Sequence, residues 1–177
     1  MKLLDIYVYG SPLLKRKTRK VAQLPDNFPR FLERMYATMY DDDGIGLSAN
    51  QVGVDLRFFI VDFSLHDKNM GKEVFINPEI IQREGEDVLE EGCLSVPGIR
   101  EKVTREWKIK VRYENLQRVV IEKEFEGYLA KVIQHEIDHL NGILFVDKTS
   151  PLNLSFIASK LKKIAVKGKT QTEPISI

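Results

Sequence analysis

The first quarter of the chain carries a pattern of apolar and polar positions typical of an amphipathic helix. Apolar residues recur there at intervals of three and four, at Phe28, Phe31, Leu32, Met35 and Met39. This period matches one face of an α-helix, and Asp26 or Asn27 can cap its start. The acidic run at 41–43, followed by Gly44, forms helix poorly. We therefore predict an N-terminal helix that ends at this run.

The pattern changes to that of β-strands between this helix and the last third of the chain. Short apolar runs at 56–62 and 74–81 predict two buried strands, separated by a polar loop. Apolar and polar residues alternate over 107–113, and the alternation resumes over 119–125 after a turn near Asn115. Two alternating segments joined by a turn predict a β-hairpin.

Two further helices are predicted after the hairpin. The helical period returns from about Gly127 to Leu140, where Asn141-Gly142 is a common helix stop. Another amphipathic helix follows Ser150-Pro151. Its apolar face is predicted to contain Leu154, Ile157, Leu161 and Ile164, and its polar face Lys160, Lys162, Lys163 and Lys167. Because strands and helices do not alternate regularly, we expect an α+β fold. Antiparallel sheets would pack around the second helix, with one N-terminal and one C-terminal helix.

Length, charge and cysteine content narrow the class of protein. The 177 residues fit one catalytic domain, predicted at 1–167, and a polar, flexible tail at 168–177. With 27 basic and 26 acidic residues, the chain has no charge excess that favours DNA or a membrane surface. No run approaches the roughly 20 apolar residues of a membrane span, and the first residues do not resemble a signal peptide. A single cysteine suits a reducing compartment, so we expect a cytoplasmic protein.

The strongest chemical signal is His135-Glu136-Ile137-Asp138-His139 inside the second predicted helix. Side chains four residues apart lie on one side of a helix, one turn apart, so both imidazoles can bind one metal ion. Glu136 can then accept a proton from a water molecule at that ion. A single buried histidine usually has only a structural role, but this spacing with the glutamate in place favours a catalytic metal site.

A catalytic metal of this kind takes three protein ligands and leaves one position open. No histidine follows His139, and the acidic candidates downstream are Asp147 and, in the tail, Glu173. Cys93 is the better candidate, because a thiolate binds soft and borderline ions strongly. The glycine before it and Pro97-Gly98 after it fit a sharp turn that presents the sulfur. A lone cysteine is ordinarily a small apolar core residue, but the missing third ligand favours Cys93 as a metal ligand here.

Three segments together resemble the motifs of the peptide deformylase family. Gly44–Gln51 resembles the glycine-rich motif G-x-G-x-A-A-x-Q, Glu91–Ser95 matches E-G-C-L-S, and Gln134–His139 matches Q-H-E-x-D-H. Their order and approximate spacing match those of the family, and the resemblance spans nearly the whole chain. Ser48 departs from the alanine usual in the first motif, which is a small change in a segment whose glycines indicate close packing.

The resemblance implies an amide hydrolase that removes the formyl group from the N-terminal formyl-methionine of new polypeptides and releases formate. It implies one divalent ion on the cysteine and the two histidines: ferrous iron, with zinc, nickel or cobalt able to occupy the same ligands. It also implies that Glu136 transfers the proton. The side-chain amide of Gln51 and the backbone N–H of Leu94 would stabilise the oxyanion.

Residues beside the motifs are candidates for binding the peptide. The methionine side chain needs an apolar pocket, for which Ile45, Tyr128 and Val132 are candidates, although each could equally pack in the core. Gly46 can let an extended peptide approach a strand edge. Arg100 can bind the peptide backbone or a carboxylate, or can be an ordinary solvated charge.

Other functions remain open from the sequence. A zincin-type metallopeptidase shares the two-histidine helix but needs a third ligand downstream. A cysteine hydrolase would use Cys93 as nucleophile and His135 as base, which leaves His139 without a role. A binding module without activity would be favoured by loss of Glu136 or Gln51, and both are present. The lysines of the last helix could contact ribosomal RNA, although a solvated helix face is the simpler interpretation.

Overall fold

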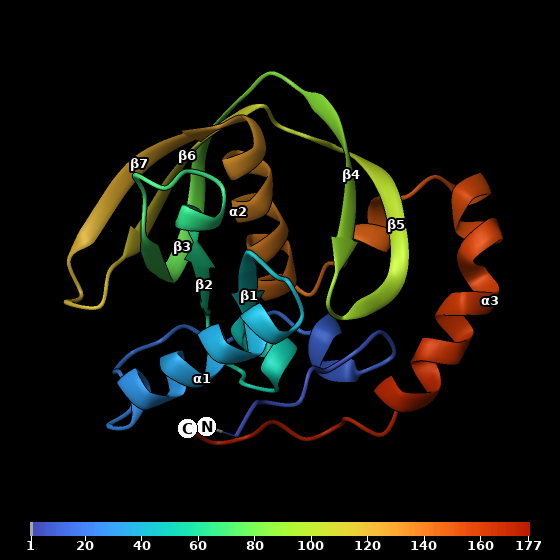
Figure 1. Cartoon of the computed structure of the whole chain (residues 1–177), viewed down its shortest axis with the longest axis horizontal. Coiled ribbons are helices and arrows are strands. Elements are labelled where there is room, and N and C mark those ends of the chain that lie inside the picture. The colour runs from blue at the N-terminus through green and yellow to red at the C-terminus, as the bar shows by residue number, and fades with distance from the viewer. Residues whose placement is uncertain (1) are drawn as a thin grey trace.

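The α-helices lie where the apolar periodicity predicts them. The computed structural model describes residues 2–177 (Figure 1). Its α-helices are α1 (Phe28–Asp41), α2 (Gly127–Leu140) and α3 (Pro151–Gly168). Short 3-10 helices add η1 (Pro12–Lys15), η2 (Ala49–Val52), η3 (Phe63–Leu65) and η4 (Phe145–Lys148). Asn27 precedes α1 without a side-chain capping bond, whereas the Ser150 side chain caps α3 by accepting a bond from the Asn153 N–H.

A five-stranded antiparallel sheet forms one wall of the molecule, in the order β1-β2-β3-β6-β7. Its strands are β1 (Gly46–Ser48), β2 (Phe58–Asp62), β3 (Lys72–Glu84), β6 (Lys108–Glu114) and β7 (Val120–Glu126). The two buried strands and the hairpin predicted from the sequence are confirmed, and β3 extends beyond its predicted apolar run. Antiparallel strands with separate helices confirm the α+β fold.

A second sheet, of two strands, was not predicted. It consists of β4 (Asp87–Cys93) and β5 (Val96–Arg105), paired antiparallel with an irregularity between Gly92 and Cys93. Most side chains of β4 are only half-buried or exposed, and many are charged. Such a strand lacks the alternation of apolar and polar residues that predicts a strand, because its inner face lies against a polar site instead of an apolar core.

Helix α2 lies between the two sheets at the centre of the molecule (Figure 1). Its apolar side, including Ala130, Ile133 and Ile137, packs with β2, β3, β6 and β7 in one buried cluster. Ten of its residues are buried, and these include Gln134, Glu136 and His139. Because both sides of the helix are covered, its polar residues are held inside the protein, where each needs a partner.

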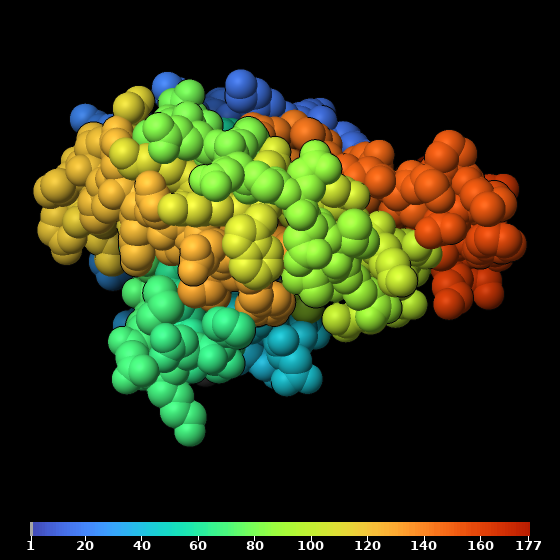
Figure 2. Space-filling model, turned by 90° about the horizontal axis from the view of Figure 1, so that it is seen from above, coloured from blue at the N-terminus to red at the C-terminus, as the bar shows by residue number. Residues whose placement is uncertain are grey.

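Helix α3 lies at one end of the molecule, outside the β4–β5 sheet (Figures 1 and 2). Ile157 and Leu161 are buried as predicted, but Leu154 is 38% exposed, so the predicted inward position of Leu154 is wrong. Asn153 instead faces β5, where its amide donates to the Glu101 carboxylate at 3.1 Å. Across residues 2–177, none of the helices has the length and apolar character required to traverse a membrane.

The segment after α3 contacts the first residues of the chain. The Gln171 side chain donates to the Ile6 carbonyl and accepts from the Val8 N–H, both at 2.9 Å. Further along, the Ile175 N–H donates to the Gly53 carbonyl at 2.9 Å. The domain boundary and the flexibility predicted for 168–177 stay predictions.

Candidate metal centre

The two histidines of α2 and the cysteine at the end of β4 converge on one point. His135 and His139 lie one helical turn apart, with their Nε2 atoms 3.2 Å from each other. Cys93 Sγ lies 3.1 Å from His139 Nε2. The three potential ligand atoms all lie within 4.8 Å of one another. The structure thus brings together the three residues that the sequence predicts as metal ligands.

The alternative third ligands lie elsewhere. The Asp147 carboxylate accepts hydrogen bonds from Lys15 Nζ at 2.5 Å and from the Leu144 N–H at 2.8 Å. Within residues 2–177, the group of potential ligands around the two histidines contains neither Asp147 nor Glu173. The arrangement therefore disfavours a zincin-type site with a downstream ligand.

A tight connection between β4 and β5 presents the sulfur of Cys93. Cys93 pairs with Val96, so only Leu94 and Ser95 separate the two strands. The Ser95 N–H and the Gln51 side-chain amide point at the sulfur, at 3.4 and 3.5 Å. Donors aimed at the sulfur orient it and stabilise negative charge on it, as metal binding requires.

The donor set fits a divalent metal ion. Two imidazole nitrogens on one tetrahedral ion lie about 3.3 Å apart, given metal–nitrogen distances of about 2.0–2.1 Å. The 3.2 Å between the histidine Nε2 atoms agrees with that spacing. Before an ion binds, burial lowers the pKa of His139. Hydrogen bonds with Cys93 and Glu91 raise the pKa of His135 in spite of its burial.

A buried ionic network holds the outer side of His135. His135 Nδ1 lies 3.0 Å from Glu91 Oε2, and Arg105 binds the Glu91 carboxylate in a bidentate pair at 2.6 and 2.8 Å. Arg105 also pairs with Asp138 and is only 2% exposed. Burial would raise the pKa of Glu91, but Arg105 and His135 lower it to about 2, so Glu91 is ionised at neutral pH.

Sequence reasoning assigned no role to Arg105, and one signal could have identified it. Arg105 is in phase with Val103 on the inward face of β5. A charged residue in register with apolar core positions needs a buried partner of opposite charge. The acidic residues of the second and third motifs, Glu91 and Asp138, are those partners.

Glu136 lies in the wall between α2 and the glycine-rich segment. It is 4% exposed, and burial raises the pKa of its carboxyl group. The backbone of Gly46 lies close to this carboxyl group, as the glycines of the segment predict. A Cβ atom at Gly46 would lie 2.7 Å from Glu136 Oε1. The Ser48 hydroxyl lies 2.5 Å from the other oxygen, Oε2.

Gln51 and Leu94 lie beside the three potential ligands. Gln51 Oε1 accepts from the Ser48 N–H at 2.9 Å, which turns Nε2 toward Cys93 Sγ and Ser95 Oγ. Leu94 follows Cys93 in the connection between β4 and β5 and lines the same cavity as Gln51. Both candidate oxyanion donors therefore lie next to the cysteine. Leu94 follows Cys93 in the sequence, and the Gln51 side chain is hydrogen-bonded to its sulfur.

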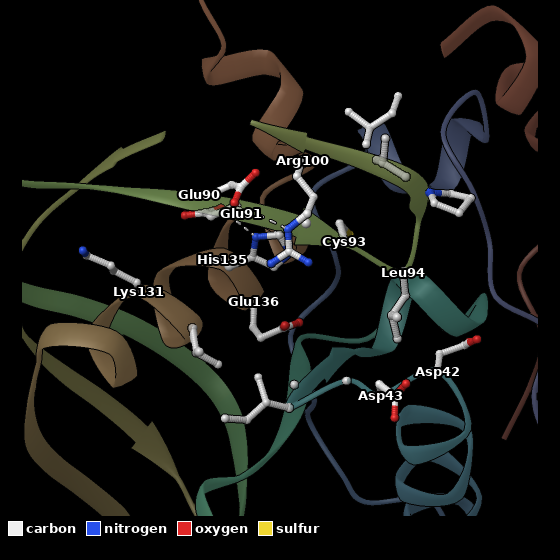
Figure 3. Close-up of a pocket in the computed structure, with 18 of the residues that line it drawn as sticks. Asp42, Asp43, Glu90, Glu91, Cys93, Leu94, Arg100, Lys131, His135 and Glu136 are labelled. Atoms are coloured by element: carbon white, nitrogen blue, oxygen red, sulfur yellow. Dashed lines mark hydrogen bonds and ion pairs between the residues drawn. The ribbon is translucent and has the colours of Figure 1, made fainter. Parts of the chain in front are cut away.

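A cavity of about 560 Å³ opens beside this cluster. Figure 3 shows Glu136 and His135 near its centre, with Lys131 and Leu94 on opposite sides. Its wall includes every residue predicted from the sequence to bind the peptide: Ile45, Gly46, Arg100, Tyr128 and Val132. Arg100 is exposed, and among residues 2–177 it pairs with Glu90 alone, at a long 4.0 Å, so its guanidinium is available to a ligand.

Tyr128, which lines the cavity, forms an aromatic pair with His66 that the sequence does not predict. Tyr128 is 44% exposed, and its ring lies 4.9 Å from the ring of His66, between ring centroids. The loop after η3 that carries His66 projects beside the residues that follow α1 (Figure 2). The β4–β5 sheet lies on the other side of α2 in the same view.

Comparison with known proteins gives one consistent result. The family model described as polypeptide deformylase matches residues 3–155. A peptide deformylase from Thermotoga sp. (strain RQ2) is 44% identical over 161 residues, which cover 90% of this chain and 95% of that protein. The crystal structure of peptide deformylase from Thermotoga maritima has a TM-score of 0.79 at 43% identity, covering 85% of this chain and 100% of that chain. The peptide deformylase from Thermus thermophilus has a TM-score of 0.86 at 36% identity, covering 94% and 99%.

The matches extend over the glycine-rich segment, the β4–β5 connection and the metal-binding helix alike. Fold, potential metal ligands and sequence similarity all agree, and the chain belongs to the peptide deformylase family of metal-dependent amide hydrolases.

Proposed function

We propose that this chain hydrolyses the N-formyl group of formyl-methionyl nascent polypeptides and releases formate and a free amino terminus. The observation that carries the proposal is that three potential metal ligands, an amide donor and a buried carboxyl group meet beside one cavity. Gln51 Nε2 lies 3.5 Å from Cys93 Sγ, and Glu136 lines the same cavity as Cys93 and His135. Hydrolysis of a formyl amide needs these three components: an electrophilic metal centre, a donor that stabilises the oxyanion and a group that transfers the proton.

Ferrous iron is the ion that we propose for Cys93, His135 and His139; zinc, nickel or cobalt could occupy the same donors. When bound, such an ion acts as a Lewis acid and makes water a nucleophile near neutral pH. The protein contributes a fixed geometry. Glu91 holds the His135 ring at Nδ1, and the Ser95 N–H holds the sulfur.

Gln51 and Leu94 are the proposed oxyanion donors. The Gln51 amide is preorganised, because its Oε1 is already bonded to the Ser48 N–H and only Nε2 is directed at the reaction site. The backbone N–H of Leu94 would provide a second donor from the connection that carries Cys93. Donors that are fixed before the reaction stabilise developing negative charge without reorganisation.

Glu136 is the proposed proton carrier. Its burial raises the pKa of its carboxyl group, which brings it closer to the neutral range in which a general base and acid operates best. In the proposed reaction, Glu136 takes a proton from the attacking water and later gives it to the leaving amine.

The substrate would lie along β1. In the described part of the chain this strand pairs with β2 alone and is an edge of the sheet, so its free side can accept an extended peptide. Ile45, Val132 and Tyr128 offer an apolar wall for the methionine side chain, and Gly46 leaves room for the peptide backbone. The exposed Arg100 would contact the peptide further along.

A transient contact with ribosomal RNA through α3 is a second part of the proposal. Its lysines are exposed and spread over the outer side of the helix: Lys160, Lys162, Lys163 and Lys167. Such a contact would be electrostatic, and salt should weaken it steeply. Co-sedimentation with ribosomes at low salt tests it, and absence of binding there would exclude it.

The reaction is tested with anaerobically purified protein loaded with ferrous iron. Formate release is measured from a formyl-Met peptide, and the acetyl-Met peptide of the same sequence is the matched control. We expect rapid release from the first and little or no hydrolysis of the second. Stoichiometric iron without any release of formate would contradict the proposed activity.

A further inference from the structure

The glycine-rich segment is bonded to α2 through the side chains of Ser48 and Asn50. Ser48 Oγ lies 2.5 Å from Glu136 Oε2 and 3.0 Å from the Glu136 carbonyl oxygen. Asn50 Nδ2 donates to the carbonyl of His139 at 2.6 Å. Ser48 is completely buried, so water does not compete for these hydrogen bonds.

Ser48 also orients the proposed oxyanion donor. Its backbone N–H donates to Gln51 Oε1 at 2.9 Å, and the opposite end of that amide points to Cys93 and Ser95. One residue therefore contacts both Gln51 and Glu136. The contact with Gln51 uses the backbone, which any residue provides. The contact with Glu136 needs a hydroxyl group, which the alanine usual in this motif lacks.

The two carboxylate oxygens of Glu136 have different surroundings. Oε1 lies where Gly46 leaves space in the cavity wall, and Oε2 lies against the Ser48 hydroxyl. A glutamate side chain has several rotamers, and a charge-assisted hydrogen bond to one oxygen selects among them. With Oε2 held by Ser48, Oε1 lies on the side of Gly46, which lines the cavity.

We propose that Ser48 is a positioning residue for deformylation: its hydroxyl holds Glu136 Oε2 and thereby aims Oε1 into the cavity. The inference rests on the proposed function. In chains with alanine at this position, Glu136 would have to be oriented by packing alone. Here the orientation depends on a hydrogen bond that a single substitution removes.

Ser48→Ala tests the proposal, because it removes the hydroxyl and keeps the backbone bond to Gln51. We expect kcat to fall about tenfold, since misplacement of a catalytic group by a fraction of an ångström is costly. KM should stay within about twofold and the metal content should stay stoichiometric, because Ser48 is neither a proposed peptide-binding residue nor a potential metal ligand. A crystal structure of the variant should show the Glu136 carboxylate in a new or mixed rotamer.

Ser11→Ala is the matched control. Ser11 is also buried, at 1% exposure, and its hydroxyl donates to the Gln171 carbonyl at 2.6 Å, away from the cavity. This variant should lower Tm while leaving kcat unchanged. An equal fall of kcat in both variants would show a general loss of packing and would overturn the proposal.

A double-mutant cycle of Ser48 and Glu136 distinguishes a positioning role of Ser48 from a purely structural one. In a Glu136→Gln background, Ser48→Ala should change the residual kcat by less than about twofold, because residues that act as a unit are not additive. A tenfold fall in that background too, or wild-type kcat in Ser48→Ala alone, would overturn the proposal. The proposed function is tested separately by formate release from the wild-type chain.

Discussion

The ring of His135 is held at both nitrogens: Nε2 lies among the potential metal ligands, and Nδ1 lies 3.0 Å from Glu91 Oε2. Glu91 is in turn bound by the buried Arg105, which also pairs with Asp138 on the same helix as His135. A carboxylate behind a metal-binding histidine fixes the ring orientation and raises its basicity as a ligand. Ligand geometry at His135 therefore depends on a residue of β5 that never meets the ion.

Replacing Arg105 by methionine should be strongly destabilising. The substitution leaves Glu91 and Asp138 buried without their shared cation, at a cost of about 3–5 kcal/mol. Urea denaturation of the metal-loaded protein measures the loss. Arg83→Met is the control, because Arg83 pairs with Glu106 at the surface, where such pairs contribute up to about 1 kcal/mol. Similar losses in the two variants would contradict the role of the network.

Cys93→Ala should abolish stoichiometric metal binding and activity together. The substitution leaves two histidines, which hold a divalent ion much more weakly than three ligands do. Metal analysis after dialysis and an assay of formate release check this outcome. Asp147→Asn should keep metal and activity, since Asp147 binds Lys15 and the Leu144 N–H. The opposite pattern would point to a zincin-type site.

Glu136→Ala should keep stoichiometric metal and lose turnover. Glu136 lines the cavity but does not belong to the group of potential ligands, so its proposed role is proton transfer. Proton transfer by a positioned side chain typically contributes about 100- to 10,000-fold. Metal analysis and single-turnover formate release on the same preparation distinguish the roles. Loss of the metal in this variant would make Glu136 a ligand instead.

Gln51→Leu should lower kcat by about 100-fold or more while metal content is retained. One oxyanion donor contributes about 3–4 kcal/mol to lowering the barrier, and leucine has a similar size but no N–H to donate. The measurement is kcat of the iron-loaded variant on a formyl-Met peptide. Turnover at the wild-type rate would remove Gln51 from the mechanism.

Gln171→Ala should destabilise the protein by about 1–3 kcal/mol, because it removes two hydrogen bonds, to Ile6 and Val8, each contributing about 0.5–1.5 kcal/mol. Thermal denaturation measures the shift. Gln117→Ala is the control, because Gln117 lies in the exposed turn between β6 and β7, where the substitution should change Tm little. An unchanged Tm in Gln171→Ala would favour the flexible tail that the sequence predicts.

The helices and the site were predictable for different reasons. The period of apolar residues predicted α1 and α2 because each packs an apolar stripe into the core. The spacing of His135 and His139 follows from helix geometry alone. Cys93 could be predicted as a ligand only by eliminating the other candidates for the third ligand, since nothing in the sequence around it distinguishes a ligand cysteine from a core cysteine. Few other side chains could serve as the third ligand, because the residues after His139 include no histidine and only two acidic residues.

The sheet β4–β5 and the network behind His135 were not predictable by the same methods. Side chains of β4 alternate between half-buried and exposed positions, and several of them are charged, so the strand lacks an apolar stripe. The partnership of Arg105 with Glu91 and Asp138 joins residues of two strands and a helix. Sequence spacing does not predict such a contact until the tertiary arrangement is known.

The first and last segments of the chain meet behind the reaction site. The Tyr7 N–H donates to the Gln51 carbonyl at 2.8 Å, and the Tyr9 N–H donates to the Ser95 carbonyl at 2.7 Å. Gln171 is bonded to the same N-terminal segment. During synthesis, residues 6–9 are made well before Gln171, which lies 165 residues after Ile6. The backing of Gln51, the proposed oxyanion donor, can therefore close only after residue 171 has been translated.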